Sequence, residues 1–281
     1  MTALIAGLSS LFWGSSDFLG GTLSRRHPVR AVVAISQSFG LLFMVLVVLL
    51  LRDPFPGWSI TPWAVIGSAC GLLGLVTFYA ALAIGTMSVV SPVAATGVVV
   101  PLLTGALTGD LPSAVGWAGA VLAIVGLMVV LAPEREVEHE LSRTDHRRSV
   151  GLAFIAALGF GGSMAAIAQG AMVSTTWTLL LMRACSVVVM LLVLFATRTR
   201  PQFRGKDLGL VAVVGVFDVS ANLTFGWASS SGQLVIAAVL GSLYPIVTVW
   251  LAWWVHGERL RRLQYLGVAV ALLGVGLMSV G

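Results

Sequence analysis

The chain has 281 residues, of which 58% are hydrophobic and only 10% are charged. Soluble domains carry about 25% charged residues, so this composition excludes a soluble protein and indicates an integral membrane protein. The formal net charge is +5, but the basic residues lie in short segments between apolar runs. There they report orientation in a bilayer, not a face that binds nucleic acid.

Apolar runs of membrane-spanning length recur along the whole chain. A helix needs about 20 residues to cross the hydrocarbon core, and charged or Pro/Gly-containing joints separate the runs. The runs lack the alternation of about ten-residue strands that is typical of an outer-membrane barrel. The sequence therefore predicts an all-α integral membrane protein with ten transmembrane helices, over residues 3–23, 30–51, 62–84, 88–108, 113–132, 150–171, 175–197, 207–229, 233–255 and 262–280.

The first predicted helix contains a carboxylate, Asp17, inside its apolar run, directly after Trp13-Gly14-Ser15-Ser16. A charge near the bilayer centre costs at least about 2.5–3.5 kcal/mol, so such residues usually face a bundle interior or a water-filled cavity. Glycine and serine beside it allow close helix approach and offer hydroxyl partners. Asp17, with Trp13 and Ser16, is a candidate site residue; the alternative is a structural aspartate satisfied by a neighbouring helix.

Predicted helices two, three, four and nine contain further polar residues and prolines. A proline in a membrane helix frees a backbone carbonyl, which is tolerated only beside partners or a cavity. Each such proline is either a hinge for a rocking motion or a kink that improves packing. The hinge candidates are Pro92, Pro101 and Pro245, and the additional pocket candidates are Gln37, Tyr79 and Tyr244.

One long hydrophilic stretch, residues 133–149, interrupts the apolar pattern. Its sequence, PEREVEHELSRTDHRRS, holds five of the chain's 11 acidic residues and four arginines. Charge runs of this kind are typical of a solvated linker. The sequence thus predicts two five-helix units, residues 1–132 and 150–281, joined by a charged linker.

The second unit holds one arginine within a predicted span, Arg183 in helix seven. Helix eight carries Asp218 and Asn222, which lie four residues apart and so share one helical face. An unpaired arginine in hydrocarbon is costly, so we expect an aspartate to neutralise it. Such a pair either only locks the helices together or leaves Arg183 to hold a substrate carboxylate in a fork geometry. In the second case Asp17 or Asp218 is free to carry a proton.

Landmark residues recur across the linker at nearly constant offsets of 144 to 148, which favours an internal duplication. The matches are Trp13–Ser16 with Phe160–Ser163, Thr77-Phe78 with Thr224-Phe225, Ala94, Gly97 and Pro101 with Ala238, Gly241 and Pro245, and Gly109-Asp110, Gly119 and Gly126 with Gly257-Glu258, Gly267 and Gly274. Because five is an odd number, two copies in series have opposite orientations. That is the inverted-repeat plan of secondary transporters, which bind substrate near the bilayer midplane.

The chain resembles the EamA type of the drug/metabolite transporter superfamily. The resemblance rests on Trp-Gly-Ser-Ser in helix one, an arginine early in helix seven, prolines in helices four and nine, and Gly-Glu-Arg-Leu (257–260) before a glycine-rich last helix. It covers essentially the whole chain. It implies export or exchange of small metabolites such as amino acids, or of toxic compounds, by alternating access without ATP hydrolysis; the sequence contains no phosphate-binding GxxxxGK[ST] loop.

The basic residues predict an orientation. Fourteen of the 16 Lys and Arg residues belong to the loops that follow helices one, five, seven and nine. The positive-inside rule places these loops in the cytoplasm and both termini outside, whereas the resemblance implies both termini inside. We expect a multi-pass protein of the plasma (cytoplasmic) membrane, with its termini outside as the charge count indicates.

Together these features predict a secondary active transporter that exports a small organic metabolite, amino-acid-like or otherwise amphipathic, with protons as the expected coupling ion. A second hypothesis is a multidrug exporter of lipophilic cations, in which the buried carboxylate binds the cation. A third, from another class, is a non-transporting receptor or scaffold. A membrane enzyme needs a nucleophile with a base or a metal site, and no histidine lies mid-span. We therefore expect no enzymatic activity, cofactor, metal or nucleic-acid partner.

Overall fold

The computed structural model describes residues 2–100, 113–130, 143–230, 244–258 and 262–280. Every regular element in these ranges is a helix, and no strand occurs among them. The elements are α1 (Thr2–Ser24), α2 (Val29–Leu51), the 3₁₀ helix η1 (Trp58–Ile60), α3 (Thr61–Ile84), α4 (Met87–Ala95), the 3₁₀ helix η2 (Thr96–Val98), α6 (Ala114–Val130), α7 (Arg143–Ala196), α8 (Lys206–Ser230), α10 (Tyr244–His256) and α11 (Arg262–Val280).

Within the described residues, two helices differ from their predicted bounds by more than two residues; residues 233–243 of the predicted ninth helix lie outside the described ranges. α4 passes into η2 after Ala95, whereas the sequence predicts one helix over 88–108; Pro92 lies inside α4, and the residues after 100 lie outside the described ranges. α7 begins at Arg143, so residues 143–149 of the predicted linker are helical. Asp145 stands in the first turn of α7, where a negative side chain interacts favourably with the helix dipole.

Four helical segments of the described chain are long and apolar enough to cross a membrane. They are Val29–Leu51, Trp58–Ile84, Thr144–Ala196 and Lys206–Ala228. The third has 53 residues, well over twice the length of one crossing, and the extended backbone of Ser174 (φ −162°, ψ 114°) divides it in two. Large apolar side chains cover the outside of these helices, among them Leu50 and Phe195. A bilayer, not water, accommodates such a surface.

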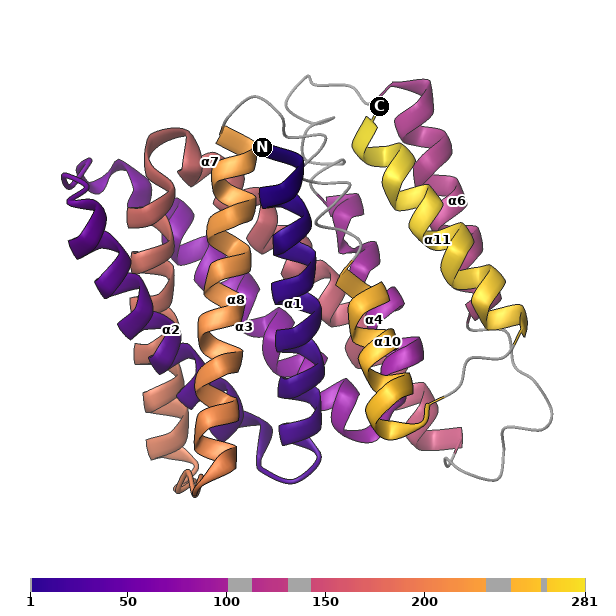
Figure 1. Ribbon diagram of the computed structural model, residues 1–281, viewed down its shortest axis with the longest axis horizontal. Helices are drawn as coiled ribbons and strands as arrows, with labels where there is room; N and C mark the ends of the chain where they lie inside the picture. The colour runs from indigo at the N-terminus through magenta and orange to yellow at the C-terminus, as the bar shows by residue number, and fades with distance from the viewer. Residues whose placement is uncertain (1, 101–112, 131–142, 231–243, 259–261, 281) are drawn as a thin grey trace.

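The helices form one bundle with an attached helix pair (Figure 1). α1 lies between α8 and α10, and α3 packs along α7 behind them. α6 and α11 lie side by side at one edge and pack mainly against each other. α1 begins and α11 ends at the same end of the molecule, which we call the termini end.

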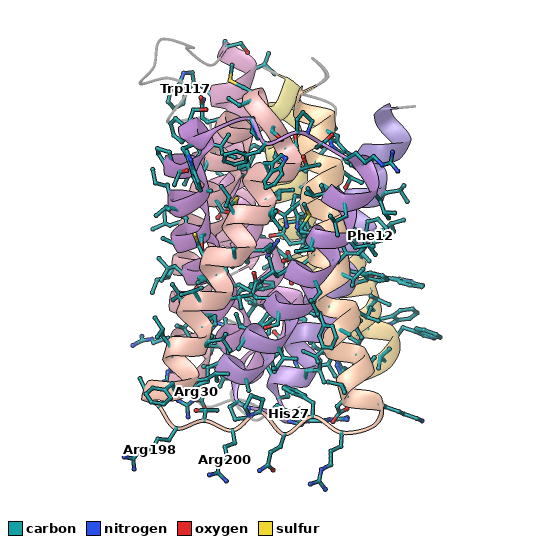
Figure 2. All side chains as sticks on the ribbon, turned by 90° about the vertical axis from the view of Figure 1, so that its left-hand side faces the viewer. Phe12, His27, Arg30, Trp117, Arg198 and Arg200 are labelled. Atoms are coloured by element: carbon teal, nitrogen blue, oxygen red, sulfur yellow. The ribbon has the colours of Figure 1, made fainter. Side chains whose placement is uncertain are left out.

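The opposite end carries many of the basic side chains, and we call it the basic end. Figure 2 shows Arg198 and Arg200 extending from it beside His27 and Arg30, while Trp117 lies near the termini end. A hydrogen bond between His27 Nε2 and Asp207 Oδ2, 2.9 Å apart, joins the α1–α2 connection to the start of α8 at this end. The basic residues of distant loops are thus gathered on one side of the bundle.

Glycines allow the closest helix contacts, as expected for helix pairs in membranes. Gly159 of α7 meets α3 so closely that a Cβ atom on Gly159 would lie 2.5 Å from the backbone nitrogen of Gly74. A backbone atom cannot rotate away as a side chain does. This contact therefore requires glycine at position 159.

We expect Gly159→Ala to destabilise the protein by about 1–3 kcal/mol, because overpacking forces α3 and α7 apart. Gly151→Ala is the matched control, since Gly151 lies on the same helix and a Cβ atom there meets nothing within 4 Å. Thermal unfolding in detergent measures the difference. Equal unfolding temperatures for the two variants would contradict the close packing described.

Residues that match at the sequence offset of 147 make matching ring contacts. The ring of Trp13 on α1 lies 5.7 Å from that of Phe225 on α8. The ring of Phe160 on α7 lies 5.4 Å from that of Phe78 on α3. Trp13 corresponds to Phe160, and Phe78 to Phe225, so each half of the chain supplies one partner to each contact.

Candidate functional site

A cavity lies in the centre of the bundle, between α1, α2, α3, α4, α7, α8 and α10. The space between its walls is about 970 Å³ when all the space between atoms and the part open to solvent are included. Its described lining extends from Asp17 to Gly67 near the start of α3 and Tyr244 at the start of α10. The cavity is thus displaced toward the termini end.

The core fills the bundle below the cavity, toward the basic end. Leu23, Tyr79, Leu82 and Met87 are almost fully buried there. Among the described residues, the lining on α1 does not reach beyond Asp17, although the helix continues to Ser24. This arrangement closes the cavity at the basic end.

One wall of the cavity is polar and is organised by Arg183. Its Nη1 atom lies 2.7 Å from Asp218 Oδ2 and donates a hydrogen bond of 2.7 Å to Gln37 Oε1. Asn222 Nδ2 in turn donates to the Asp218 carbonyl at 2.6 Å and to Asp218 Oδ1 at 3.2 Å, as the predicted spacing of four residues allows. The guanidinium and the Asp218 carboxylate are therefore held against each other from both sides.

Asp17 is the second carboxylate of this wall and remains unpaired. Its side chain lines the cavity and is 7% exposed. Within the described part of the chain it has no hydrogen bond or ion pair, although it lies close enough to Asp218 to interact with it electrostatically. Two carboxylates and one guanidinium leave the cavity with one uncompensated negative charge when all three groups are ionised.

The wall that α3 and the first part of α7 form is mostly apolar, although Ser163 also belongs to it. Leu72 and Leu75 come from α3, and Phe160, Met164 and Ile167 come from the first part of α7. At the offset of 147, Asp17 corresponds to Met164, so the two halves contribute different chemistry to equivalent places. A cavity with one charged and one apolar wall suits an amphipathic solute.

The structure brings most of the predicted site residues together. Trp13 and Tyr244 also line the cavity, with ring centroids 6.3 Å apart. Ser16 does not belong to the lining, because its hydroxyl donates a 3.0 Å hydrogen bond to the Val214 carbonyl and ties α1 to α8. Tyr79 is fully buried in the core against Gly20. In this structure Ser16 and Tyr79 therefore contribute to helix packing and do not line the cavity.

The predicted hinge residues occupy different places. Pro92 is buried inside α4, and Pro245 is buried in the first turn of α10. Pro101 lies outside the described residues. Pro245 directly follows the cavity residue Tyr244, whereas Pro92 lies two residues before the cavity residue Ala94.

Sequence reasoning missed the apolar wall and the hydroxyl pair beside it. Ser68 of α3 and Ser186 of α7 both line the cavity, and their Oγ atoms lie 2.9 Å apart. Met164 and Met182 carry no local signal, since an apolar residue that faces a cavity looks like one that faces lipid. Serines in apolar runs most often bond neighbouring helices, so only their position in the fold singles them out.

A second polar cluster, the basic-end cluster, consists of Thr22, Arg25, Ser88, His256 and Glu258. Arg25 Nη2 lies 2.8 Å from Glu258 Oε1. The backbone nitrogen and the hydroxyl of Ser88 donate to Glu258 Oε2 at 3.3 and 3.1 Å, and Thr22 Oγ1 lies 2.9 Å from His256 Nε2. The cluster joins α10 and Glu258, in the second half of the chain, to α1 and α4 in the first.

No metal site is evident within the described ranges, where three or more His, Cys, Asp or Glu side chains do not gather in one place. The polar wall offers charged and hydrogen-bonding side chains to whatever enters the cavity.

Comparison with known proteins gives one family. The model of the EamA-like transporter family matches residues 1–132 and 147–280, on either side of the charged stretch. No curated protein matches the sequence. Among the matching solved structures, one described only as the crystal structure of a protein superposes with a TM-score of 0.69 at 16% sequence identity, covering 99% of this chain and 97% of the other. At that identity the likeness shows the fold alone.

Proposed function

The chain belongs to the EamA-like transporter family, and on that premise we propose that it is a secondary transporter that exports a small amphipathic organic solute through the central cavity. The observation that carries the proposal is the unpaired Asp17 carboxylate in a cavity that also has an apolar wall. Ionisable residues at membrane depth mark substrate or proton pathways by default. Membership of the family makes the chain a membrane transporter of small solutes; the solute class, its direction and its coupling are our inference.

Proton coupling is assigned to Asp17 because the other carboxylate of the cavity, Asp218, already pairs with Arg183. In this scheme Asp17 is protonated from outside as the solute leaves, and a solute that binds from the cytoplasm displaces the proton. Asp218 is held by Arg183 and Asn222, so Asp17 is the carboxylate of this wall that has no partner within the described residues. One free carboxylate is sufficient for exchange of one proton per solute.

Alternating access follows from an inverted repeat of two five-helix halves, ten transmembrane helices in all. The matching ring contacts support this plan, and so do two glycine contacts: Gly14 lies against Tyr244, and Gly161 lies against Val100. Positions 14 and 161 differ by 147 and positions 100 and 244 by 144, the offsets of the sequence repeat. These matched contacts between the halves support an inverted repeat in which the halves rock about the cavity.

The basic-end cluster closes the cavity on the side that the positive-inside rule places in the cytoplasm. Opening toward the cytoplasm separates α10 from α1 and α4, so the contacts of Glu258 with Arg25 and Ser88 have to break. In this proposal the protein lies in the plasma membrane with both termini outside, and the structure corresponds to the state closed to the cytoplasm.

We expect Glu258→Gln to shift the protein toward the state open at the basic end. The variant loses one partly exposed ion pair, worth up to about 1 kcal/mol, or roughly a fivefold change in population. The reporter is Ser91→Cys in a chain with Cys70 and Cys185 replaced by Ala, because Ser91 is fully buried on α4, one turn from Ser88. A charged thiol reagent added from the basic side of membrane vesicles should label it faster in the variant.

Asp53→Asn is the control for that experiment. Asp53 lies at the other end, where its carboxylate accepts a 2.6 Å hydrogen bond from Thr176. Its loss should leave labelling from the basic side unchanged. Labelling at the same rate in Glu258→Gln and in the unmodified background would remove the basic-end cluster from the closing mechanism.

The proposed function is tested by comparing the culture media of cells that express the protein and cells that do not, with untargeted mass spectrometry. Export predicts at least one organic compound that accumulates outside only when the protein is made. An unchanged medium would contradict export, and uptake assays would then follow. A receptor or scaffold predicts that no solute moves in either direction.

A further inference from the structure

We propose that the cavity recognises an organic amine in its cationic form, with the ammonium group at Asp17 and an apolar tail along the opposite wall, and that a carboxylate on the solute is not needed. This inference rests on the proposed function only in taking the cavity as the solute site. It differs from the sequence-based hypothesis in which Arg183 holds a substrate carboxylate. It shares with the second hypothesis a cation at the buried carboxylate, and it names the residue and the class of cation.

The pairing of Arg183 is the first argument. Its Nη1 atom serves both Asp218 and Gln37 at 2.7 Å, and its buried Nε atom has no partner within the described structure. A guanidinium has five N–H donors, so the hydrogen-bonding capacity of Arg183 is not used up. Its positive charge, however, is already balanced by Asp218. A solute carboxylate therefore enters a cavity that has no free counter-charge for it.

The charge of the cavity is the second argument. With Arg183 and Asp218 paired, Asp17 supplies the only unbalanced charge among the ionisable residues that line the described cavity. An ammonium group neutralises it, and with three N–H donors it also provides the hydrogen bonds that this carboxylate lacks. A solute carboxylate adds a second unbalanced negative charge beside that of Asp17, and like charges at such a site are costly.

The position of Asp17 relative to the apolar groups is the third argument. Trp13 stands four residues before Asp17 on α1 and so lies on the same helical face. An ammonium at Asp17 is within reach of the Trp13 ring for a cation–π contact. From there the tail extends toward Phe160 and Met164 on the other wall, where it replaces water against apolar side chains.

The test compares three compounds with the same phenyl tail and different charges: 2-phenylethylamine, L-phenylalanine and 3-phenylpropionate. Binding to the purified full chain in lipid nanodiscs is measured by isothermal titration calorimetry near neutral pH. We expect the amine to bind tightest and the anion weakest, with the amine favoured over the anion by roughly tenfold or more, since charges at close range interact by several kcal/mol at a partly buried site.

Two variants identify the group responsible. Asp17→Asn should remove most of the preference for the amine. Asp207→Asn should keep it, because Asp207 lies in the first turn of α8, outside the cavity. Tighter binding of phenylalanine or phenylpropionate than of the amine, no measurable binding of the amine, or an unchanged order in Asp17→Asn would each overturn the proposal.

The outcome is separable from that of the proposed function. If the amine binds at Asp17 but no solute crosses the membrane, the amine site stands and transport is refuted. If a compound is exported but the amine does not bind, transport stands and the amine assignment is refuted.

Discussion

Export by Asp17→Asn is expected to lose its dependence on a pH gradient. Asparagine has nearly the shape of aspartate but carries no proton that the gradient can drive, so the coupled cycle stops at the step where the solute and the proton exchange. The measurement uses proteoliposomes loaded with the compound identified in the culture medium, with and without an imposed gradient. The variant should release it at about the rate of vesicles without protein.

Asp207→Asn provides the comparison, because Asp207 pairs with His27 at the basic end and lies outside the cavity. It should retain the wild-type response to the gradient. An Asp17→Asn protein with the wild-type rate and pH dependence would leave Asp17 with a structural role only.

The second large effect is expected for the Arg183–Asp218 pair. Arg183→Met or Asp218→Leu alone leaves the other charge buried without its partner, which costs about 3–5 kcal/mol of folding stability. The double variant removes both charges and should recover much of that loss, because well-packed apolar residues replace buried ion pairs at little or no cost. Thermal unfolding of the purified proteins in one detergent compares the two single variants with the double one.

This double-mutant comparison separates a coupled pair from two independent sites. If the losses of the single variants simply add in the double variant, the two side chains do not stabilise each other. If the pair is coupled as its 2.7 Å contact indicates, the double variant also serves as a background for binding experiments. Of the three charged residues that line the described cavity, it retains Asp17 alone.

The sequence determined much of the fold because the bilayer imposes a length on each helix. α1, α2, α3 and α8 begin and end within one residue of the predicted bounds. A run of about 20 apolar residues between polar breakers leaves few alternatives to a spanning helix. Local spacing also placed Asp218 and Asn222 on one helical face, and their hydrogen bond confirms that arrangement.

The choice between the two aspartates came only from the tertiary structure. Nothing in the sequence says whether Asp17 or Asp218 is the partner of Arg183. The hydrogen bond from Arg183 to Gln37, which lies 146 residues away along the chain, is likewise visible only in the fold. The same holds for Ser16 and Tyr79, which share helices with cavity residues but face a neighbouring helix and the core.

The physical reason lies in the solvent. In water, a polar stripe and an apolar stripe identify the two faces of a helix. In a membrane, the lipid-facing and core-facing sides of a helix are both apolar. Composition therefore predicts where the helices lie in the sequence, but not which side of each helix faces the core. The sequence by itself determined that this chain crosses a membrane as helices, that its two halves repeat, and that a few charges are buried. Only the packing of those halves decided that Arg183 and Asp218 neutralise each other and that Asp17 faces the cavity unpaired.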